Sequence, residues 1–131
     1  MKEHVLIVED DELLMSLLTL HLEDAEYKIS SAGTGEEALS LYAKEKIDLI
    51  VLDLTLPDLD GMDILERIRK ESSVPILILT ARKSKIDKLI GHGSGASVYM
   101  VKPVEPQELI LRVGKLLDPD SPDETEPATL V

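Results

Sequence analysis

Residues 49–61 read LIVLDLTLPDLDG. Four consecutive apolar residues, Leu49 to Leu52, form the short uninterrupted run that is typical of a strand buried on both faces of a sheet. The run leads into a carboxylate, Asp53, and Pro57 then stops the strand from continuing. A buried strand that leads into an acid indicates that this acid has a function at the edge of a sheet.

Short apolar runs like this one alternate with helix-like segments along the chain. Strands are predicted at residues 5–8, 27–32, 49–52, 74–79 and 98–101. Helices are predicted at residues 13–22, 34–44, 62–70, 84–90 and 106–117. The second strand is more polar than the others, which favours a position at the edge of the sheet. Five strands alternating with five helices predict an α/β fold with a parallel sheet between layers of helices.

Local signals indicate where three of these helices begin. Asp11 precedes the first helix and is expected to cap it. Thr34 and Glu37 have the spacing of a capping box, in which both side chains accept hydrogen bonds from open amides. Pro106 stands at the first turn of the last helix, where proline is favoured.

The composition restricts the classes of function. The chain has 131 residues, 44% of them hydrophobic, which predicts one domain with a packed core. Its net charge of −12 argues against binding of nucleic acid or an anionic membrane, because both need a basic face. No apolar run approaches the roughly 20 residues of a membrane span, and the first residues lack the apolar region of a signal peptide. With no cysteine to form disulfides, a cytoplasmic location is expected.

Polar residues follow the strands at the edge where ligands gather in parallel sheets. Glu9 and Asp10 follow the first strand, Asp53 the third, Thr80 the fourth and Lys102 the fifth. Two unit charges 4 Å apart repel by roughly 4 kcal/mol at an effective dielectric constant of 20, so clustered carboxylates need protons, a lysine or a divalent cation. Hard oxygen ligands of this kind suit Mg²⁺.

Four segments stand out along the chain: VLIVEDDELL (5–14), LIVLDLTLPDLDGMDIL (49–65), PILILTA (75–81) and YMVKP (99–103). Together they resemble the receiver domain of two-component response regulators. They occur in order and at the spacing of the family, and the resemblance covers residues 4 to about 117. It implies a flavodoxin-like, doubly wound fold: a five-stranded parallel sheet of order 2-1-3-4-5 flanked by five helices. Residues 1–117 would form this domain.

The resemblance also implies a phosphoacceptor site. Asp53 would accept a phosphoryl group from a phospho-histidine on a sensor histidine kinase or a histidine phosphotransfer protein. Mg²⁺, with Mn²⁺ as a possible substitute, would be bound by Asp10, Asp53 and the backbone carbonyl of Thr55. Glu9 would act on the metal through water.

Three further residues complete the implied mechanism. Lys102 would neutralise the incoming phosphoryl oxygens, Thr80 would hydrogen-bond the attached phosphoryl group, and Tyr99 would turn inward behind it. The Lys102–Pro103 peptide is expected to be cis. The implied function is therefore that of a signalling domain, not an enzyme with a released substrate. Phosphorylation would switch the face formed by the fourth helix, fifth strand and fifth helix, and so control an output or a partner.

The chain departs from the family pattern at several positions. Ser97 and Val98 stand where many members carry two acids of a dimer interface, so we expect a monomer or a weak phosphorylation-dependent dimer. Val104 replaces a usual Phe. Gly91 and Gly93 disfavour helix by roughly 1 kcal/mol each, which predicts a short or frayed fourth helix.

Other functions remain alternatives at this point. A pseudo-receiver, which switches without phosphate, is opposed by the retention of every expected site position. A Mg²⁺-dependent hydrolase would need a general acid or base beside Asp53, and the sequence contains no candidate. Asp58 and Asp60 mimic the DxDG of haloacid-dehalogenase phosphatases, but there the first Asp directly follows a strand, whereas Pro57 precedes Asp58 here. The same segment lacks the late Glu of a calcium loop, so a solvated turn is expected.

The last residues differ in composition from the rest of the chain. Residues 118–131, DPDSPDETEPATLV, contain five acids, three prolines and no base. Low hydrophobicity and a single sign of charge are typical of disordered segments. We expect a disordered tail, or a linker to an output domain.

Overall fold

The structure is a computed structural model that describes residues 2–81, 83–84 and 95–120. These residues contain a five-stranded parallel sheet with the order β2-β1-β3-β4-β5. Its strands are β1 (His4–Val8), β2 (Lys28–Ala32), β3 (Leu49–Asp53), β4 (Ile76–Thr80) and β5 (Val98–Val101). The predicted flavodoxin-like fold, its strand order and the edge position of β2 are confirmed.

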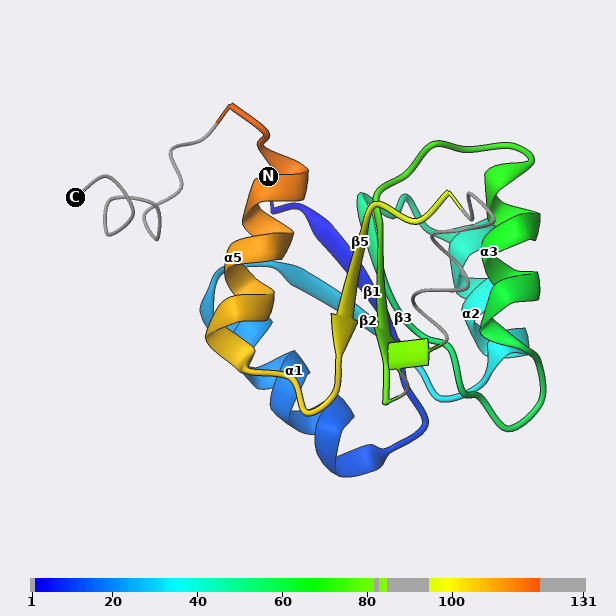
Figure 1. Ribbon diagram of the computed structural model, residues 1–131. Coiled ribbons are helices and arrows are strands. Elements are labelled where there is room, and N and C mark those ends of the chain that lie inside the picture. The colour runs from blue at the N-terminus through cyan, green and yellow to red at the C-terminus, as the bar shows by residue number, and fades with distance from the viewer. Residues whose placement is uncertain (1, 82, 85–94, 121–131) are drawn as a thin grey trace.

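Helices cover both faces of the sheet. The described helices are α1 (Glu12–Asp24), α2 (Gly35–Lys44), α3 (Gly61–Arg69) and α5 (Pro106–Leu117). As Figure 1 shows, α1 and α5 lie on one face, and α2 and α3 lie on the other. The predicted fourth helix, with Gly91 and Gly93, lies outside the described residues apart from Ser84. No described helix has both the length and the apolar character to span a bilayer.

Alternating side chains of the strands fill two cores. In β1, Leu6 and Val8 pack on the side of α2 and α3, and Val5 and Ile7 pack on the side of α1 and α5. All four are buried, which explains why this strand reads as an uninterrupted apolar run. Full burial of such a side chain stabilises the fold by roughly 1.5–3 kcal/mol.

The helix caps follow most of the local sequence signals. The Asp11 carboxylate accepts hydrogen bonds from the backbone N–H groups of Leu13 and Leu14, as predicted. Thr34 Oγ1 accepts from the N–H of Glu37 at 3.1 Å. The Glu37 carboxylate accepts from the N–H of Gly33, which lies one residue before the position that a capping box predicts.

Gly61 allows α3 to begin directly against the end of β3. A Cβ atom at this position would lie 2.7 Å from Leu54 Cα and 3.0 Å from the carbonyl oxygen of Asp53. We expect Gly61→Ala to lower the free energy of unfolding by about 1–3 kcal/mol in urea denaturation, because the contacts are with backbone. Gly33→Ala is the control, since a Cβ there has no neighbour within 4 Å. Equal losses in both variants would contradict the prediction.

Candidate functional site

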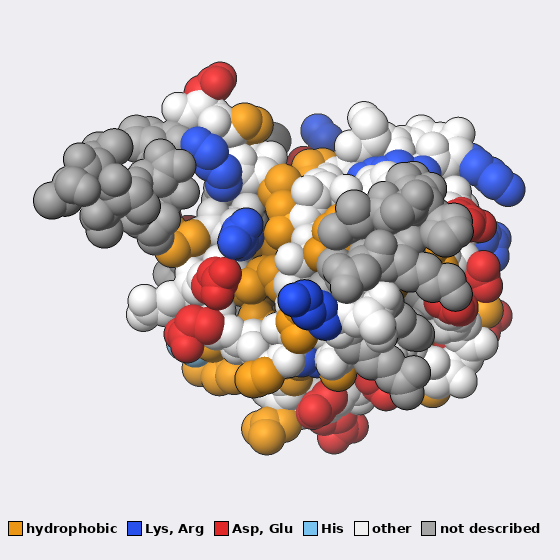
Figure 2. All heavy atoms as spheres, in the orientation of Figure 1, with side chains coloured by type: hydrophobic (Ala, Val, Ile, Leu, Met, Phe, Trp, Pro, Cys, Tyr) orange, Lys and Arg blue, Asp and Glu red, His pale blue; other side chains and the backbone are white. Residues whose placement is uncertain are grey.

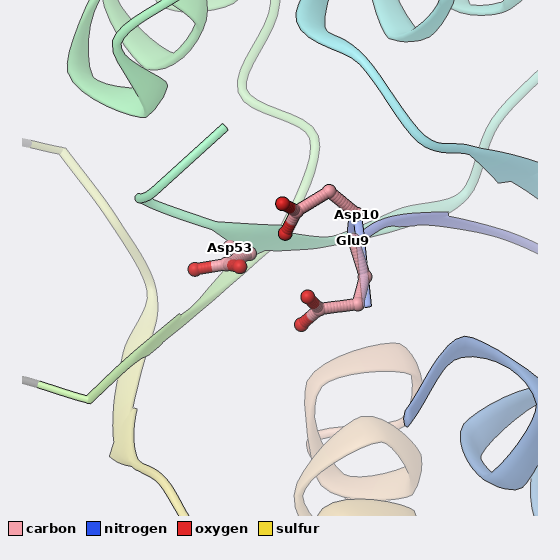
Figure 3. A group of neighbouring side chains, drawn as sticks. All are labelled: Glu9, Asp10 and Asp53. Carbon is pink, nitrogen blue, oxygen red and sulfur yellow. The ribbon is translucent and has the colours of Figure 1, made fainter. Parts of the chain in front are cut away.

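Three carboxylates meet where β1 and β3 end. Glu9 and Asp10 directly follow β1, and Asp53 is the last residue of β3. Because these strands are paired neighbours, one oxygen from each side chain lies within 4.8 Å of the others (Figure 3). Glu9 and Asp53 are buried, whereas Asp10 is exposed to solvent. The cluster is therefore rooted in the sheet and open on one side.

An ammonium group from a third strand enters the cluster. Lys102 follows β5, and its Nζ atom lies 2.8 Å from Glu9 Oε1 and 3.1 Å from Asp53 Oδ2. Its backbone N–H donates to the carbonyl of Thr80 at 2.8 Å, and the Lys102–Pro103 peptide is cis, as predicted. The lysine side chain thus crosses the end of β4 to reach residues of β3 and the β1–α1 connection.

Burial and charge shift the proton affinities in this cluster. Burial raises the pKa of Glu9 to about 6, and the charge of Asp53 acts in the same direction, while the Lys102 contact and the Asp11 N–H oppose it. For Lys102, burial by itself lowers the pKa, but the contacts and charges of Glu9 and Asp53 together outweigh it and raise the pKa. Lys102 therefore remains a cation beside an excess of negative charge.

One buried oxygen retains unused bonding capacity. Glu9 Oε1 faces the Lys102 ammonium at 2.8 Å, and within the described residues no second donor reaches this oxygen. The other carboxylate oxygen of Glu9 accepts from the Asp11 N–H at 3.1 Å. A buried acceptor left in this state has capacity for a water molecule or a cation.

Both oxygens of Asp53 are held by neighbours. Oδ1 accepts from the backbone N–H of Thr55 at 3.0 Å, and Oδ2 faces Lys102. Thr55 in turn forms an isolated antiparallel bridge with Asp60. The loop after β3 therefore folds back beside the carboxylate, which restricts the orientation of the Asp53 side chain.

Thr80 and Tyr99, which the resemblance predicted to respond to the phosphoryl group, lie on β4 and β5. Thr80 is fully buried and is the last residue of β4, one position beyond Leu79, which is the register partner of Asp53. It therefore lies at the same edge of the sheet as the carboxylates. Tyr99 on β5 is paired with Ile78, deeper in the sheet, and packs partly buried against the core beneath α2 and α3.

Sequence reasoning missed the contacts of two acids in the loop after β3. Asp58 and Asp60 are exposed, as a solvated turn predicts, but both make defined hydrogen bonds. Asp60 caps α3 by accepting from the N–H of Met62. Asp58 accepts from the N–H groups of Gly35 and Glu36 at the start of α2. The local sequence contains no signal for this contact, because it spans more than 20 residues.

A cavity of about 720 Å³ lies near the amino ends of β1 and β2, at the end of the strands opposite to the acidic cluster. Its lining includes His4, Tyr27 and Lys46, and none of the predicted site residues. His4 is buried, and its Nε2 atom is 2.7 Å from Ser30 Oγ. We therefore place the candidate site at the acidic cluster, where the titrating groups converge.

The fold and this cluster define an α/β domain with an acidic site at the carboxyl ends of its strands, where the sheet order reverses between β1 and β3. Residues 5–114 match the response regulator receiver domain, and the chain belongs to this family. It is thus a signalling domain of the two-component type, as the sequence resemblance predicted.

Similar proteins support the same assignment. The chain is 42% identical over 118 residues to PhoP, the alkaline phosphatase synthesis transcriptional regulatory protein of Bacillus subtilis, covering 89% of this chain and 49% of PhoP. It is 37% identical over 131 residues to the DNA-binding response regulator MtrA of Mycolicibacterium smegmatis, covering all of this chain and 56% of MtrA. The chain spans about half the length of the curated relatives it matches.

Solved structures match over nearly the whole fold. A CheY-like receiver domain protein from Methanospirillum hungatei has a TM-score of 0.84 at 28% identity, covering 96% of this chain and 99% of that one. The response regulator TrrA from Thermotoga maritima, solved in complex with Mg²⁺ and BeF, has a TM-score of 0.80 at 33% identity, covering 88% and 99%.

Proposed function

We propose that Asp53 of this chain accepts a phosphoryl group from a phospho-histidine and that the charge it gains switches an output. The observation that carries the proposal is the contact of Asp53 Oδ2 with Lys102 Nζ at 3.1 Å, within a cluster of three carboxylates. Phosphoryl transfer needs positioning and charge neutralisation more than covalent chemistry from the protein. A nucleophile rooted in a buried strand beside a fixed cation meets both needs.

The donor set fits a hard divalent cation. Asp10, Asp53 and the backbone carbonyl of Thr55 would bind Mg²⁺ directly, with Mn²⁺ as a substitute, and the buried Glu9 would hold one of its waters. The excess negative charge of three carboxylates beside one ammonium supports this assignment. When bound, Mg²⁺ supplies positive charge that neutralises the transferring phosphoryl group.

The phosphoryl group is transferred in one step. A carboxylate oxygen of Asp53 forms a bond to phosphorus while the bond from phosphorus to the donor imidazole nitrogen breaks, and the leaving nitrogen takes up a proton from water. Lys102 neutralises phosphoryl oxygens during this step. The Thr80 hydroxyl then donates a hydrogen bond to the attached phosphoryl group, and Tyr99 turns inward behind Thr80. Hydrolysis of the acyl phosphate returns Asp53 to its starting state.

An apolar stripe on α1 supports a protein donor. Leu13, Leu17 and Leu20 are 81%, 40% and 64% exposed, and their spacing places them on one side of the helix. Figure 2 shows hydrophobic side chains at the surface over α1. The helix begins two residues after Asp10, so this stripe would contact a partner whose phospho-histidine faces Asp53. A sensor histidine kinase or a histidine phosphotransfer protein has the required chemistry.

The output would lie beyond the receiver domain. PhoP and MtrA are named as regulators of transcription or DNA-binding proteins, and both are longer than this chain. We propose that the domain ends near Leu117 and that residues 118–131 act as a linker. We further propose that the face formed by the predicted fourth helix, β5 and α5 controls an output domain or partner. Regulation of this kind fits a monomer or a weak phosphorylation-dependent dimer.

Incubation with acetyl phosphate and Mg²⁺ tests the proposed function. We expect a mass gain of one phosphate that hydroxylamine removes and that EDTA prevents, because an acyl phosphate forms only with the metal present. An unlabelled but folded protein would instead indicate a pseudo-receiver. Steady release of phosphate from an added phosphate ester would indicate a hydrolase.

Mg²⁺ is expected to raise the melting temperature of the wild-type protein. At a concentration of a hundred times the Kd, it should add about 2.7 kcal/mol to the free energy of unfolding. Asp10→Asn should melt higher than the wild type without metal, because one repelling charge is removed, and should gain less from Mg²⁺. Differential scanning fluorimetry measures both changes. Asp24→Asn at the far end of α1 is the control. An undiminished Mg²⁺ response in Asp10→Asn would contradict the metal assignment.

A further inference from the structure

We propose that Asp58 is a positioning residue, which holds the loop of residues 54–60 against the start of α2 and thereby keeps Thr55 in place beside Asp53. The inference rests on the proposed function only where it takes Thr55 as part of the metal site. Asp58 itself touches neither the carboxylate cluster nor Lys102 in the contacts that the described residues make.

Asp58 binds the first turn of α2 with both carboxylate oxygens. Oδ1 accepts from the N–H of Gly35 at 2.8 Å, and Oδ2 accepts from the N–H of Glu36 at 3.0 Å. The hydrogen bond from Gly35, together with the one from Glu36, lowers the pKa of Asp58. A carboxylate anion at the positive end of a helix makes stronger hydrogen bonds than a neutral acceptor does.

Close packing reinforces the same contact. A Cβ atom on Gly35 would lie 2.8 Å from Leu59 Cβ and 2.8 Å from the Cδ1 atom of Ile64. The loop therefore lies against the first residue of α2 with no room for a larger side chain. Any shift of the loop away from α2 would break the two hydrogen bonds and open this packed contact.

The other end of the loop leads to the site. Thr55 donates its N–H to Asp53 Oδ1 at 3.0 Å and pairs with Asp60 in the isolated bridge. Only Leu56 and Pro57 separate Thr55 from Asp58. A displacement of Asp58 is therefore transmitted over two residues to the N–H that orients the Asp53 carboxylate.

A helix cap alone does not account for this contact. Thr34, which directly precedes α2 in the sequence, already caps this helix, because its Oγ1 atom accepts a hydrogen bond from the Glu37 N–H. Asp58 adds a link from a different part of the chain. Thr34→Ala and Asp58→Ala therefore weaken the same helix end, and only the second releases the loop.

Amide hydrogen exchange by NMR and calorimetric Mg²⁺ titration of the full chain test the proposal. We expect Thr34→Ala and Asp58→Ala to lower the melting temperature alike. Only Asp58→Ala should speed exchange of the Thr55 N–H and weaken Mg²⁺ binding, by about tenfold, as is typical for residues that support metal ligands. Asp58→Asn should preserve most of both properties, because it keeps an acceptor for the Gly35 N–H.

The outcomes separate the inference from the proposed function. Unchanged Thr55 exchange in Asp58→Ala overturns the inference, and so does an equal effect of Thr34→Ala. Weakened Mg²⁺ binding in Asp58→Asn with unchanged Thr55 exchange also overturns it, because charge alone would then be the cause. If the wild type itself bound no Mg²⁺, the metal assignment would fail, and the exchange of the Thr55 N–H would still decide the role of Asp58.

Discussion

Asp53→Asn is expected to abolish phosphate incorporation from acetyl phosphate, with a loss of at least about a thousandfold in rate. An amide oxygen lacks the negative charge that attacks phosphorus, and the variant offers no other nucleophile at this position. The substitution is nearly isosteric, so the acceptor for the Thr55 N–H at 3.0 Å is retained. Intact-mass spectrometry of the treated protein measures the effect.

Stability separates loss of the nucleophile from loss of the fold. Removing one charge from a cluster of three carboxylates reduces repulsion, so the metal-free Asp53→Asn protein should be at least as stable as the wild type. Asp63→Asn makes the same chemical change in the first turn of α3 and should be labelled like the wild type. Labelling of folded Asp53→Asn at the wild-type rate would refute the assignment of the phosphoacceptor.

Lys102→Met is expected to slow phosphate incorporation by at least about a hundredfold, because it removes the fixed cation that neutralises the phosphoryl oxygens. The same substitution should strengthen the binding of Mg²⁺. The Nζ atom lies within 3.1 Å of Glu9 and Asp53, so its removal leaves the carboxylates without a competing cation, and Mg²⁺ should bind more tightly. Methionine keeps most of the apolar stem of the side chain.

Labelling rate and calorimetric Mg²⁺ titration measure these two effects in the same protein. General damage to the site would weaken both properties together, whereas the proposed role predicts a slower transfer with tighter metal binding. Lys46→Met, at the opposite end of the strands, is the matched control and should change neither. A Lys102→Met protein that is labelled as fast as the wild type would exclude Lys102 from the transfer.

The strands and the edge of the sheet where the site lies were predictable, because apolar runs and the residues that follow them are short-range features of the sequence. The apolar run from Leu49 to Leu52 predicted a buried strand, and the position of Asp53 at its end follows directly. Parallel strands place their carboxyl ends on one edge, so the sequence alone assigns Glu9 and Thr80 to that edge. The strand boundaries shifted slightly: Asp53 and Thr80 are the last residues of their strands, because the register extends to them.

Contacts between distant segments were not predictable in this way. The local sequence around Asp58 indicated only an exposed turn, and its partners Gly35 and Glu36 come close because β1 and β3 are neighbours with α2 beside them. Likewise, the leucine-rich sequence of α1 does not reveal which leucines face solvent. Leu18 is fully buried and Leu17 is 40% exposed, a difference set by the packing of the helix against the sheet.

Periodicity, helix caps and residue types at strand ends were therefore sufficient to predict an α/β fold with polar residues gathered at one edge of its sheet. The resemblance of four segments to receiver domains supplied the family and the expected roles of those residues. Folding in three dimensions added the distances: the lysine after β5 reaches across β4 to two carboxylates, and the loop after β3 is tied to α2. The physical reason is that local backbone preferences extend over a few residues. Hydrogen bonds and ion pairs between distant segments form only after the order and packing of the strands bring their partners within about 3 Å.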